Sequence, residues 1–491
     1  MNQKIIFAPG FNEAEILKSL ALHGINTIGM RVMNAAELAS FALVRSGVHV
    51  PEKMLSPQEE LVIIADAARS EKYFEKASYA DISDLRAAVR SLRSLVTEDD
   101  EIKTVEEKLS QGLFKEKNEA LISLFSKYIS ALKDKNLADG ISLVRCAIEN
   151  NCTLDQEIVC LAEFPLTPLE EKLAETVSGG NCRKRSISVL YLEDRTMPEK
   201  VTVRNCYGAA NEVETIIDDI YRGKSLDQCT VAVTDTSAYS QLFFDYAVRH
   251  DIPVTFGCGI PVSNSNPAAL LKLYNNWTTK GFFGAEALAK MLSDSSFDRS
   301  ALKDEFPVTE NYRWDDLVET LGTLRMTNDR LQNDERVKSY IQAVNEEEKE
   351  LGPRYEKTLN RKSVLIPLIK VAARELALAP EEFLRKYSRI RKGNSTYTES
   401  LVMTLDRSAL SSLCEQIRTV RSAGQSVSDV INDLLGMNVC AQSSTGGAVH
   451  ITDIKGAFQN LRKNLYIAGM AASKRKINTS LISILYKQNT K

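Results

Sequence analysis

Residues 210–256, ANEVETIIDDIYRGKSLDQCTVAVTDTSAYSQLFFDYAVRHDIPVTF, decide the fold class of this chain. Their first part has helical periodicity and leads into the apolar run CTVAVTD (229–235), which is typical of a short strand. A second helical stretch follows, and IPVTF (252–256) is again typical of a strand. Strands that alternate with helices of about 10–15 residues build βαβ units and a mainly parallel sheet. The stretch therefore predicts an α/β fold.

The N-terminus has the same alternation. An apolar run ending in Pro-Gly precedes a helical stretch, and a second strand and helix follow: KIIFAPG (4–10), FNEAEILKSLALHG (11–24), INTIGMRVM (25–33) and NAAELASFALVRSG (34–47). A later strand is expected at EIVCLAEF (157–164). Two further strands are expected in the second α/β region at SISVLYLE (186–193) and VTVRNCYGA (201–209).

Two long stretches between these regions are almost wholly helical. The first begins at Ser56-Pro57-Gln58-Glu59, which has an N-cap Ser, a Pro at the first position and a Glu three residues after the Ser. Near the C-terminus, AVHITDIKG (448–456) and NLYIAGM (464–470) return to strand patterns. The predicted segments are a first α/β domain (1–55 and 151–190), a helical insertion (56–150), a second α/β domain (191–277 and 436–472), a helical insertion (278–435) and a basic tail (473–491).

Composition supports a soluble globular protein. The chain has 491 residues, of which 44% are hydrophobic and 26% charged, so we expect three or four domains rather than a disordered or fibrous chain. Nine cysteines without a CxxC pair and four scattered histidines show no zinc-ligand spacing and predict reduced thiols in a cytoplasmic protein. No secretory leader or run of about 20 apolar residues is present, so we expect no membrane partner.

The turn around Gly10 is the first candidate site. A strand–turn–helix at this place is where a phosphate loop lies, because backbone N–H groups and the helix dipole favour an anion. Such a loop needs further glycines and a Lys-Ser/Thr pair, but Gly10 is its only glycine and Glu13 and Glu15 begin the helix. We therefore expect a degenerate phosphate loop that binds no cofactor.

Two carboxylates provide further candidates. Glu163 follows a strand, where a Walker B motif would place an acid, but it stands alone and is expected to be solvated. Asp453 and Lys455 form an Asp-x-Lys pattern on an apolar strand, which is typical of metal-dependent nucleases. The preceding segment NVCAQSSTGGA contains no acid for the same metal, so a catalytic role for Asp453 and Lys455 is the alternative rather than the main interpretation. No metal site and no catalytic residue are predicted otherwise.

A basic run provides the candidate DNA contacts. The net charge of the whole chain is −3, yet residues 354–392 hold 11 Lys or Arg against 4 Asp or Glu, a local net of +7. Clustered cations can contact phosphates, although most charge runs are solvated helix faces. The predicted contacts are Lys386, Arg389, Arg391 and Lys392, which lie in a run with Arg385.

Several of these strings together resemble the N-terminal part of the AddB-like family, which comprises ATP-dependent helicase/nuclease proteins with a C-terminal PD-(D/E)XK nuclease. The resemblance spans about residues 1–472. The strings are IIFAPGFNEAEILKSLALHG with INTIGMRVMNAAELA, LAEFPLTPLEEKLAE, ANEVETIIDDI with VAVTDTSAYSQLFFDYAVRHDIPVTFGCGIPVSNSNPAALLKLYNNW, and VHITDIKGAFQNLRKNLYIAGM.

The resemblance implies two RecA-like domains, each with a helical insertion, as in superfamily 1 helicases. It also implies that intact members are exonucleases that use Mg²⁺ and, in some members, an iron–sulfur cluster. Here the Walker A Lys and Ser/Thr and the Walker B Asp are absent, and the end, KRKINTSLISILYKQNTK, matches nothing in the family. The expectation is therefore a chain truncated before the nuclease domain, with an inactivated P-loop.

The resulting hypothesis is a catalytically inactive, helicase-like scaffold of a DNA-repair nuclease. Its expected partners are DNA, as a single strand or a duplex end, and a helicase protein, with no small-molecule substrate. Two alternatives remain open: a metal-dependent nuclease using Asp453 and Lys455, and a module that binds only protein.

Overall fold

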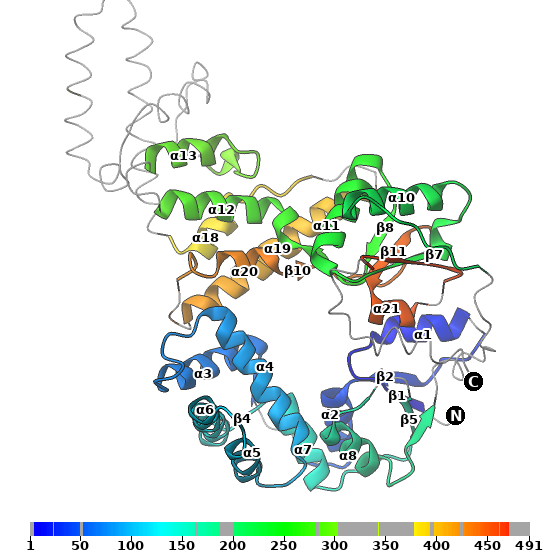
Figure 1. Cartoon of the computed structure of the whole chain (residues 1–491), viewed down its shortest axis with the longest axis vertical. Helices are drawn as coiled ribbons and strands as arrows, with labels where there is room; N and C mark the ends of the chain where they lie inside the picture. Colours follow the sequence, from blue (N-terminus) through cyan, green and yellow to red (C-terminus); the bar gives the residue numbers. More distant parts are fainter. Residues whose placement is uncertain are drawn as a thin grey trace, which may run out of the picture. The chain divides into compact units, whose positions relative to one another are not determined.

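The computed structural model describes residues 4–22, 24–49, 53–162, 165–185, 200–279, 284–302, 342, 378–392, 397–422, 424, 426–460 and 462–470. The chain divides into two compact units. Unit 1 comprises residues 1–247, 253–259 and 441–491, and unit 2 comprises 248–252 and 260–440. Both predicted α/β regions and the first helical stretch contribute to unit 1 (Figure 1).

The first sheet of unit 1 is parallel and has the order β2-β1-β5-β6 in the described residues. The strands are β1 (Lys4–Phe7), β2 (Met30–Met33), β5 (Glu157–Leu161) and β6 (Arg183–Arg185). Ile5 lies opposite Arg31 on one side and Ile158 on the other. Since β1 and β5 are nearly continuous apolar runs, both of their faces must be covered.

Helices pack on both faces of this sheet. They are α1 (Glu13–Leu22), α2 (Ala35–Arg45), α7 (Gly140–Glu149) and α8 (Pro168–Val177). Phe7 and Ile5 pack with α2, α7 and α8, whereas Ile6 packs with α1 on the opposite face (Figure 1). The alternation of side chains along β1 thus separates two apolar clusters.

The helical insertion of unit 1 contains α3 (Pro57–Arg69), α4 (Tyr79–Leu95), α5 (Glu101–Ser110) and α6 (Lys115–Asp134), with a short parallel pair, β3 (Lys53–Met54) and β4 (Leu137–Ala138). The expected start of α3 is confirmed: the Ser56 and Glu59 side chains accept from each other's backbone N–H in a capping box.

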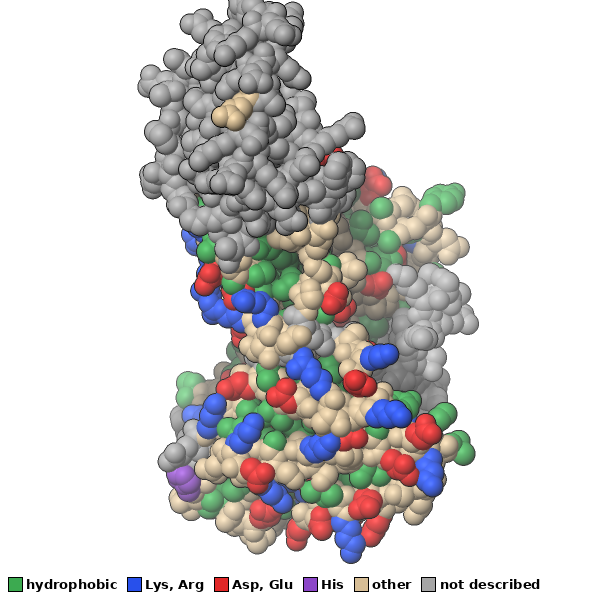
Figure 2. Space-filling model, turned by 90° about the vertical axis from the view of Figure 1, so that its left-hand side faces the viewer, with side chains coloured by type: hydrophobic (Ala, Val, Ile, Leu, Met, Phe, Trp, Pro, Cys, Tyr) green, Lys and Arg blue, Asp and Glu red, His purple; other side chains and the backbone are tan. Residues whose placement is uncertain are grey.

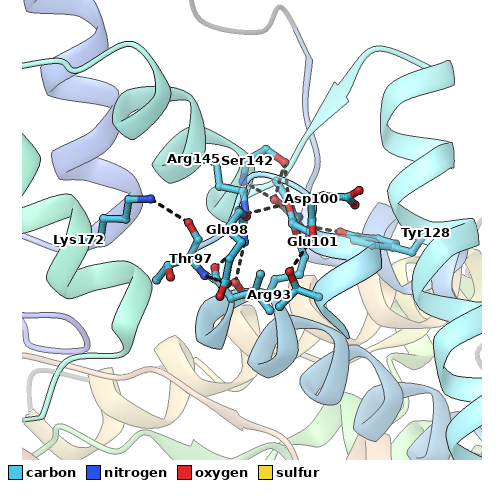
Figure 3. Close-up of polar contacts among 12 residues, drawn as sticks. Arg93, Thr97, Glu98, Asp100, Glu101, Tyr128, Ser142, Arg145 and Lys172 are labelled. Carbon is cyan, nitrogen blue, oxygen red and sulfur yellow. Dashed lines mark hydrogen bonds and ion pairs between the residues drawn. The ribbon is translucent and has the colours of Figure 1, made fainter. Parts of the chain in front are cut away.

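Buried charges connect the helices of this insertion. The Arg93 side chain, only 3% exposed, lies between Glu101 and Asp139, and the Tyr128 hydroxyl donates to Asp139 at 2.9 Å (Figure 3). Arg145 pairs with the same Glu101 at 2.7 Å. Burial opposes the ionisation of Asp139, but the Arg93 guanidinium and the hydrogen bonds from Ser142 and Tyr128 together outweigh it, so the pKa of that carboxyl lies below its usual value.

The second sheet of unit 1 is also parallel and has the order β12-β7-β11-β8 in the described residues. The strands are β7 (Cys229–Val233), β8 (Val254–Phe256), β11 (Val449–Asp453) and β12 (Asn464–Ala468), and the helices are α10 (Ala209–Tyr221), α11 (Thr236–His250) and α21 (Ile454–Gln459), with the 3-10 turn η1 (Leu226–Gln228). Two segments more than 180 residues apart therefore share one sheet, since Ile451 lies between Val231 and Phe256.

Unit 2 is mainly helical in its described residues. It contains α12 (Asn266–Thr279), α13 (Gly284–Ser293), α18 (Pro380–Tyr387), α19 (Tyr397–Ser422) and α20 (Ile431–Gly436), the 3-10 turns η2 (Val262–Asn264) and η4 (Arg299–Leu302), and the antiparallel pair β9 (Ile260–Pro261) and β10 (Asn438–Val439). Its core is aromatic: Tyr274 packs on Phe383 with ring centroids 4.4 Å apart, and Phe297 stacks on Tyr387.

Several details differ from the sequence prediction. The strand expected at residues 201–209 is wrong: residues 200–206 have no regular structure, and Val203 and Tyr207 are exposed, so their apolar side chains face no core. The β9–β10 pair joins residues 436–440 to unit 2, so the return to unit 1 begins at residue 441 rather than 436. Three predicted features lie outside the described residues: the strand expected at 186–193, nearly half of the second helical insertion (303–341 and 343–377) and the tail 473–491.

Candidate functional site

The turn between β1 and α1 is closed by its own side chains. Gly10 has a φ of +76°, which favours glycine, and the N–H of Phe11 donates to the carbonyl of Ala8 at 3.1 Å. The Asn12 side chain accepts from the N–H groups of Ala14 at 2.9 Å and Glu15 at 3.4 Å. These are the amides that a bound phosphate would need. The turn is therefore a capped helix start with few amides left for an anion.

Side chains from the C-terminal segment of unit 1 occupy the outer side of this turn. The Lys455 ammonium lies 5.3 Å from the centre of the Phe11 ring, and a Cβ on Gly10 would come within 2.4 Å of the Lys455 Nζ. The Gln459 side chain accepts from the N–H of Asn12 at 2.9 Å. Helix α21 therefore places an ammonium and a side-chain amide directly against the β1–α1 turn.

Helix α1 is further joined to residues 444–460 by buried hydrogen bonds. The Glu15 carboxylate, 5% exposed, accepts from the backbone N–H and the hydroxyl of Ser444 and from the Asn460 amide at 3.1 Å. Lys18 donates to the carbonyl and hydroxyl of Ser444, and the Ser19 hydroxyl donates to the Gln459 carbonyl at 2.8 Å. The first turns of α1 are thus bonded to the neighbourhood of the second sheet, beside α21 (Figure 1).

Asp453 and Lys455 are not directed at a common ligand. The Asp453 side chain accepts from the N–H of Gly456 at 2.6 Å and caps α21, whereas Lys455 extends to Phe11. Across the described part of the chain, no three His, Cys, Asp or Glu side chains are grouped as metal ligands. In this arrangement the Asp453 carboxylate stabilises the start of a helix.

Close packing surrounds the end of β11. A Cβ on Gly456 would lie 2.0 Å from the Thr452 hydroxyl oxygen, and one on Gly257 would lie 2.7 Å from the same atom. His450 is buried next to them, and its Nδ1 hydrogen bonds to the Thr255 hydroxyl at 2.9 Å. Burial, with the charges of Arg462 and Lys18, lowers the pKa of His450 to about 3, so the ring is neutral at pH 7.

The predicted DNA contacts lie at α18 and just after it in unit 2. Lys386, Arg389 and Lys392 are exposed, with Lys386 lying 5.0 Å over the Tyr387 ring. Arg391 has a different role: its guanidinium donates to the fully buried Asp406 at 2.6 and 2.8 Å. Lys386, Arg389 and Lys392 thus present exposed side chains to solvent, whereas Arg391 is committed to an internal ion pair.

Glu163 and residues 354–377 of the basic run lie outside the described residues. Within the described part, no helix is both long and apolar enough to cross a bilayer.

Neither a protein-family model nor a curated relative matches the chain.

Sequence reasoning missed the partners of Glu15. In the sequence Glu13 and Glu15 indicate only the start of a helix, but the Glu15 carboxylate accepts hydrogen bonds from Ser444 and Asn460, more than 400 residues away. Glu13 instead accepts from the N–H of Val32 at 3.2 Å. No local pattern indicates such contacts, because the two segments meet only in the folded unit.

Proposed function

We propose that this chain is a non-catalytic, helicase-like scaffold that binds DNA through unit 2. The supporting observation is the closed β1–α1 turn. The side chains of Asn12 and Gln459 accept hydrogen bonds from its backbone N–H groups, and Lys455 lies against it. A nucleotide-driven motor needs that space for its β- and γ-phosphates and for Mg²⁺. The chain would thus keep the two-sheet arrangement of a RecA-like pair without its ATP chemistry.

The AddB-like assignment belongs to the same proposal. Both sheets are parallel, with β1 and β5 central in one and β7 and β11 central in the other, as a pair of RecA-like domains would require. In such sheets, ligands bind beyond the carboxyl ends of the strands at the point where strand order reverses. The β1–α1 turn and the end of β11 lie at such positions. The backbone N–H groups there donate to side chains of the protein itself, Asn12 in the turn and Asp453 after β11.

DNA binding is assigned to the exposed cations Lys386, Arg389 and Lys392. Charges on the helical insertion of unit 1 favour DNA less, because residues 56–150 hold 14 Lys or Arg against 18 Asp or Glu. Figure 2 shows the two signs interspersed over the lower part of the molecule, where unit 1 faces the viewer. A polyanion needs clustered positive charge, and α18 with the residues after it offers these three exposed cations close in sequence, with Arg385 as a fourth.

A fluorescence anisotropy titration with labelled single-stranded and duplex DNA tests this proposal. The triple variant K386A/R389A/K392A should weaken binding roughly tenfold and lower the slope of log K against log salt concentration by about 2–3, since each lost phosphate contact removes close to one unit.

The matched control is K103A/K108A/K117A, which removes three exposed lysines from α5 and α6 and should change neither quantity. Equal losses in both triple variants would contradict a site at α18. Absence of DNA binding by the wild-type chain at low salt would favour a module that binds only protein. DNA cleavage with Mg²⁺ that is lost in D453N would favour the nuclease alternative.

A further inference from the structure

Two cysteines in the first sheet lie in direct contact. Cys160 is in β5, and Cys182 immediately precedes β6, the neighbouring parallel strand. Their sulfurs are 2.9 Å apart, and both are free thiols. Both side chains pack on the sheet face that α2, α7 and α8 cover. An S–S bond is about 2.05 Å long, so these sulfurs need to approach by only about 0.9 Å to bond.

The two thiols have different environments. Cys160 is 2% exposed within the apolar cluster, whereas Cys182 is partly exposed and lines an open cavity of about 860 Å³ with Asn181, Arg183 and Glu157. A small oxidant in solvent therefore reaches Cys182 first. The hydrogen bond from Cys160, aided by the charge of Lys184, lowers the pKa of Cys182, and the same contact together with burial raises the pKa of Cys160.

We propose that Cys160 and Cys182 are a redox-active pair that forms a reversible disulfide on reaction with hydrogen peroxide. The Cys182 thiolate attacks one peroxide oxygen, the O–O bond breaks, and the sulfenic acid and hydroxide are formed. The Cys160 sulfur then attacks the Cys182 sulfur, the S–O bond breaks, and water leaves. In total two thiols and one peroxide become one disulfide and two waters, so the two sulfurs are oxidised and the peroxide oxygens are reduced.

The backbone around Cys182 can accommodate this change. Ladder pairing between β5 and β6 begins at Arg183, and the segment before it is a turn that contains Gly179 and Gly180, both at positive φ. Cys182 therefore lies just outside the paired strand and needs to move by less than one bond length. The disulfide would join β6 covalently to β5 and close a loop that contains α8.

Peptide mapping of the full-length folded chain tests the pair. The reduced protein is treated with hydrogen peroxide, blocked with N-ethylmaleimide and digested. We expect a Cys160–Cys182 cross-linked peptide as the main product, loss of two of the nine titratable thiols, and full recovery after treatment with a dithiol reductant. In C160S, the Cys182 sulfenic acid should persist and be trapped by dimedone.

The control is C206S, which removes another partly exposed thiol and should leave the cross-link unchanged. The proposal is overturned if Cys160 and Cys182 are recovered singly alkylated while other thiols oxidise. It is also overturned if the cross-link appears only in denaturant, because the folded contact would then have no role. The wild-type map is informative even if a serine variant does not fold.

Discussion

His450 shows how one residue can make the stability of a whole sheet depend on pH. It lies in β11 between β7 and β8, where the ring is 2% exposed and bonded to Thr255. The buried ring resists protonation, since burial and two nearby cations lower its pKa to about 3. The unfolded chain would protonate the same ring with a pKa of about 6.5.

This difference predicts acid sensitivity. Below pH 6.5 the unfolded state binds a proton that the folded state excludes, so the free energy of unfolding falls as pH decreases until the folded ring also titrates near pH 3. The loss from His450 alone is about 2 kcal/mol between pH 7 and pH 5. Urea unfolding of the wild type and H450N at both pH values measures it.

Asparagine is the matched replacement, because its amide can reach Thr255 as Nδ1 does but cannot titrate. H450N should lose about 2 kcal/mol less than the wild type on going from pH 7 to pH 5. An identical pH dependence in the two proteins would show that the ring is accessible to protons in the folded state.

Arg93 stabilises the packing of several helices, because it joins α4 to α5 and to the start of α7. It is bonded to Glu101 and Asp139, and Arg145 of α7 shares the Glu101 carboxylate (Figure 3). These side chains are almost fully buried, so Asp139 depends on the Arg93 guanidinium for compensation, whereas Glu101 is also paired with Arg145. Removal of one member of such a pair leaves a buried charge unpaired, which costs about 3–5 kcal/mol.

The predicted result is that R93M lowers the free energy of unfolding of the helical insertion by about 3–5 kcal/mol. Urea denaturation followed by far-UV circular dichroism measures it. R69M, which removes an exposed pair between Arg69 and Asp66, should cost less than about 1 kcal/mol. Comparable losses in both variants would mean that burial does not set the energetics of this network.

The individual strands show how far the sequence predicts the fold. Short apolar runs with a clear helix after them, such as those at Ile5 and Val231, were confirmed as parallel strands because burial on both faces leaves a continuous apolar signal. Val201 and Val203 carry a similar signal, yet they are exposed, because tertiary context and not propensity decides whether a strand finds a partner.

At the candidate site, only the lack of phosphate-binding residues could be predicted from the sequence. The absence of a phosphate-loop Lys-Ser/Thr pair can be read from residues near Gly10. The contacts that fill the place, from Lys455 and Gln459, cross more than 440 residues of sequence and have no local signature. Arg391 likewise reads as one more cation, and only the buried Asp406 distinguishes it from its exposed neighbours.

In the whole molecule, the closed β1–α1 turn links the first sheet to residues of the second. Unit 1 brings the two parallel sheets together through hydrogen bonds of Glu15, Ser19 and Asn12 with residues 444–460. These bonds use groups that a nucleotide-binding cleft would leave open. The proposed scaffold would therefore hold its sheets in one arrangement without a nucleotide.

The most direct measurement is a titration of the folded full-length chain with a fluorescent ATP analogue in the presence of Mg²⁺. The closed turn predicts no saturable binding up to millimolar nucleotide and no hydrolysis, because Asn12 and Gln459 already accept from the turn amides and Lys455 lies against the same turn. Saturable binding in the micromolar range that unlabelled ATP displaces would contradict it, and would show that the turn opens to hold a phosphate.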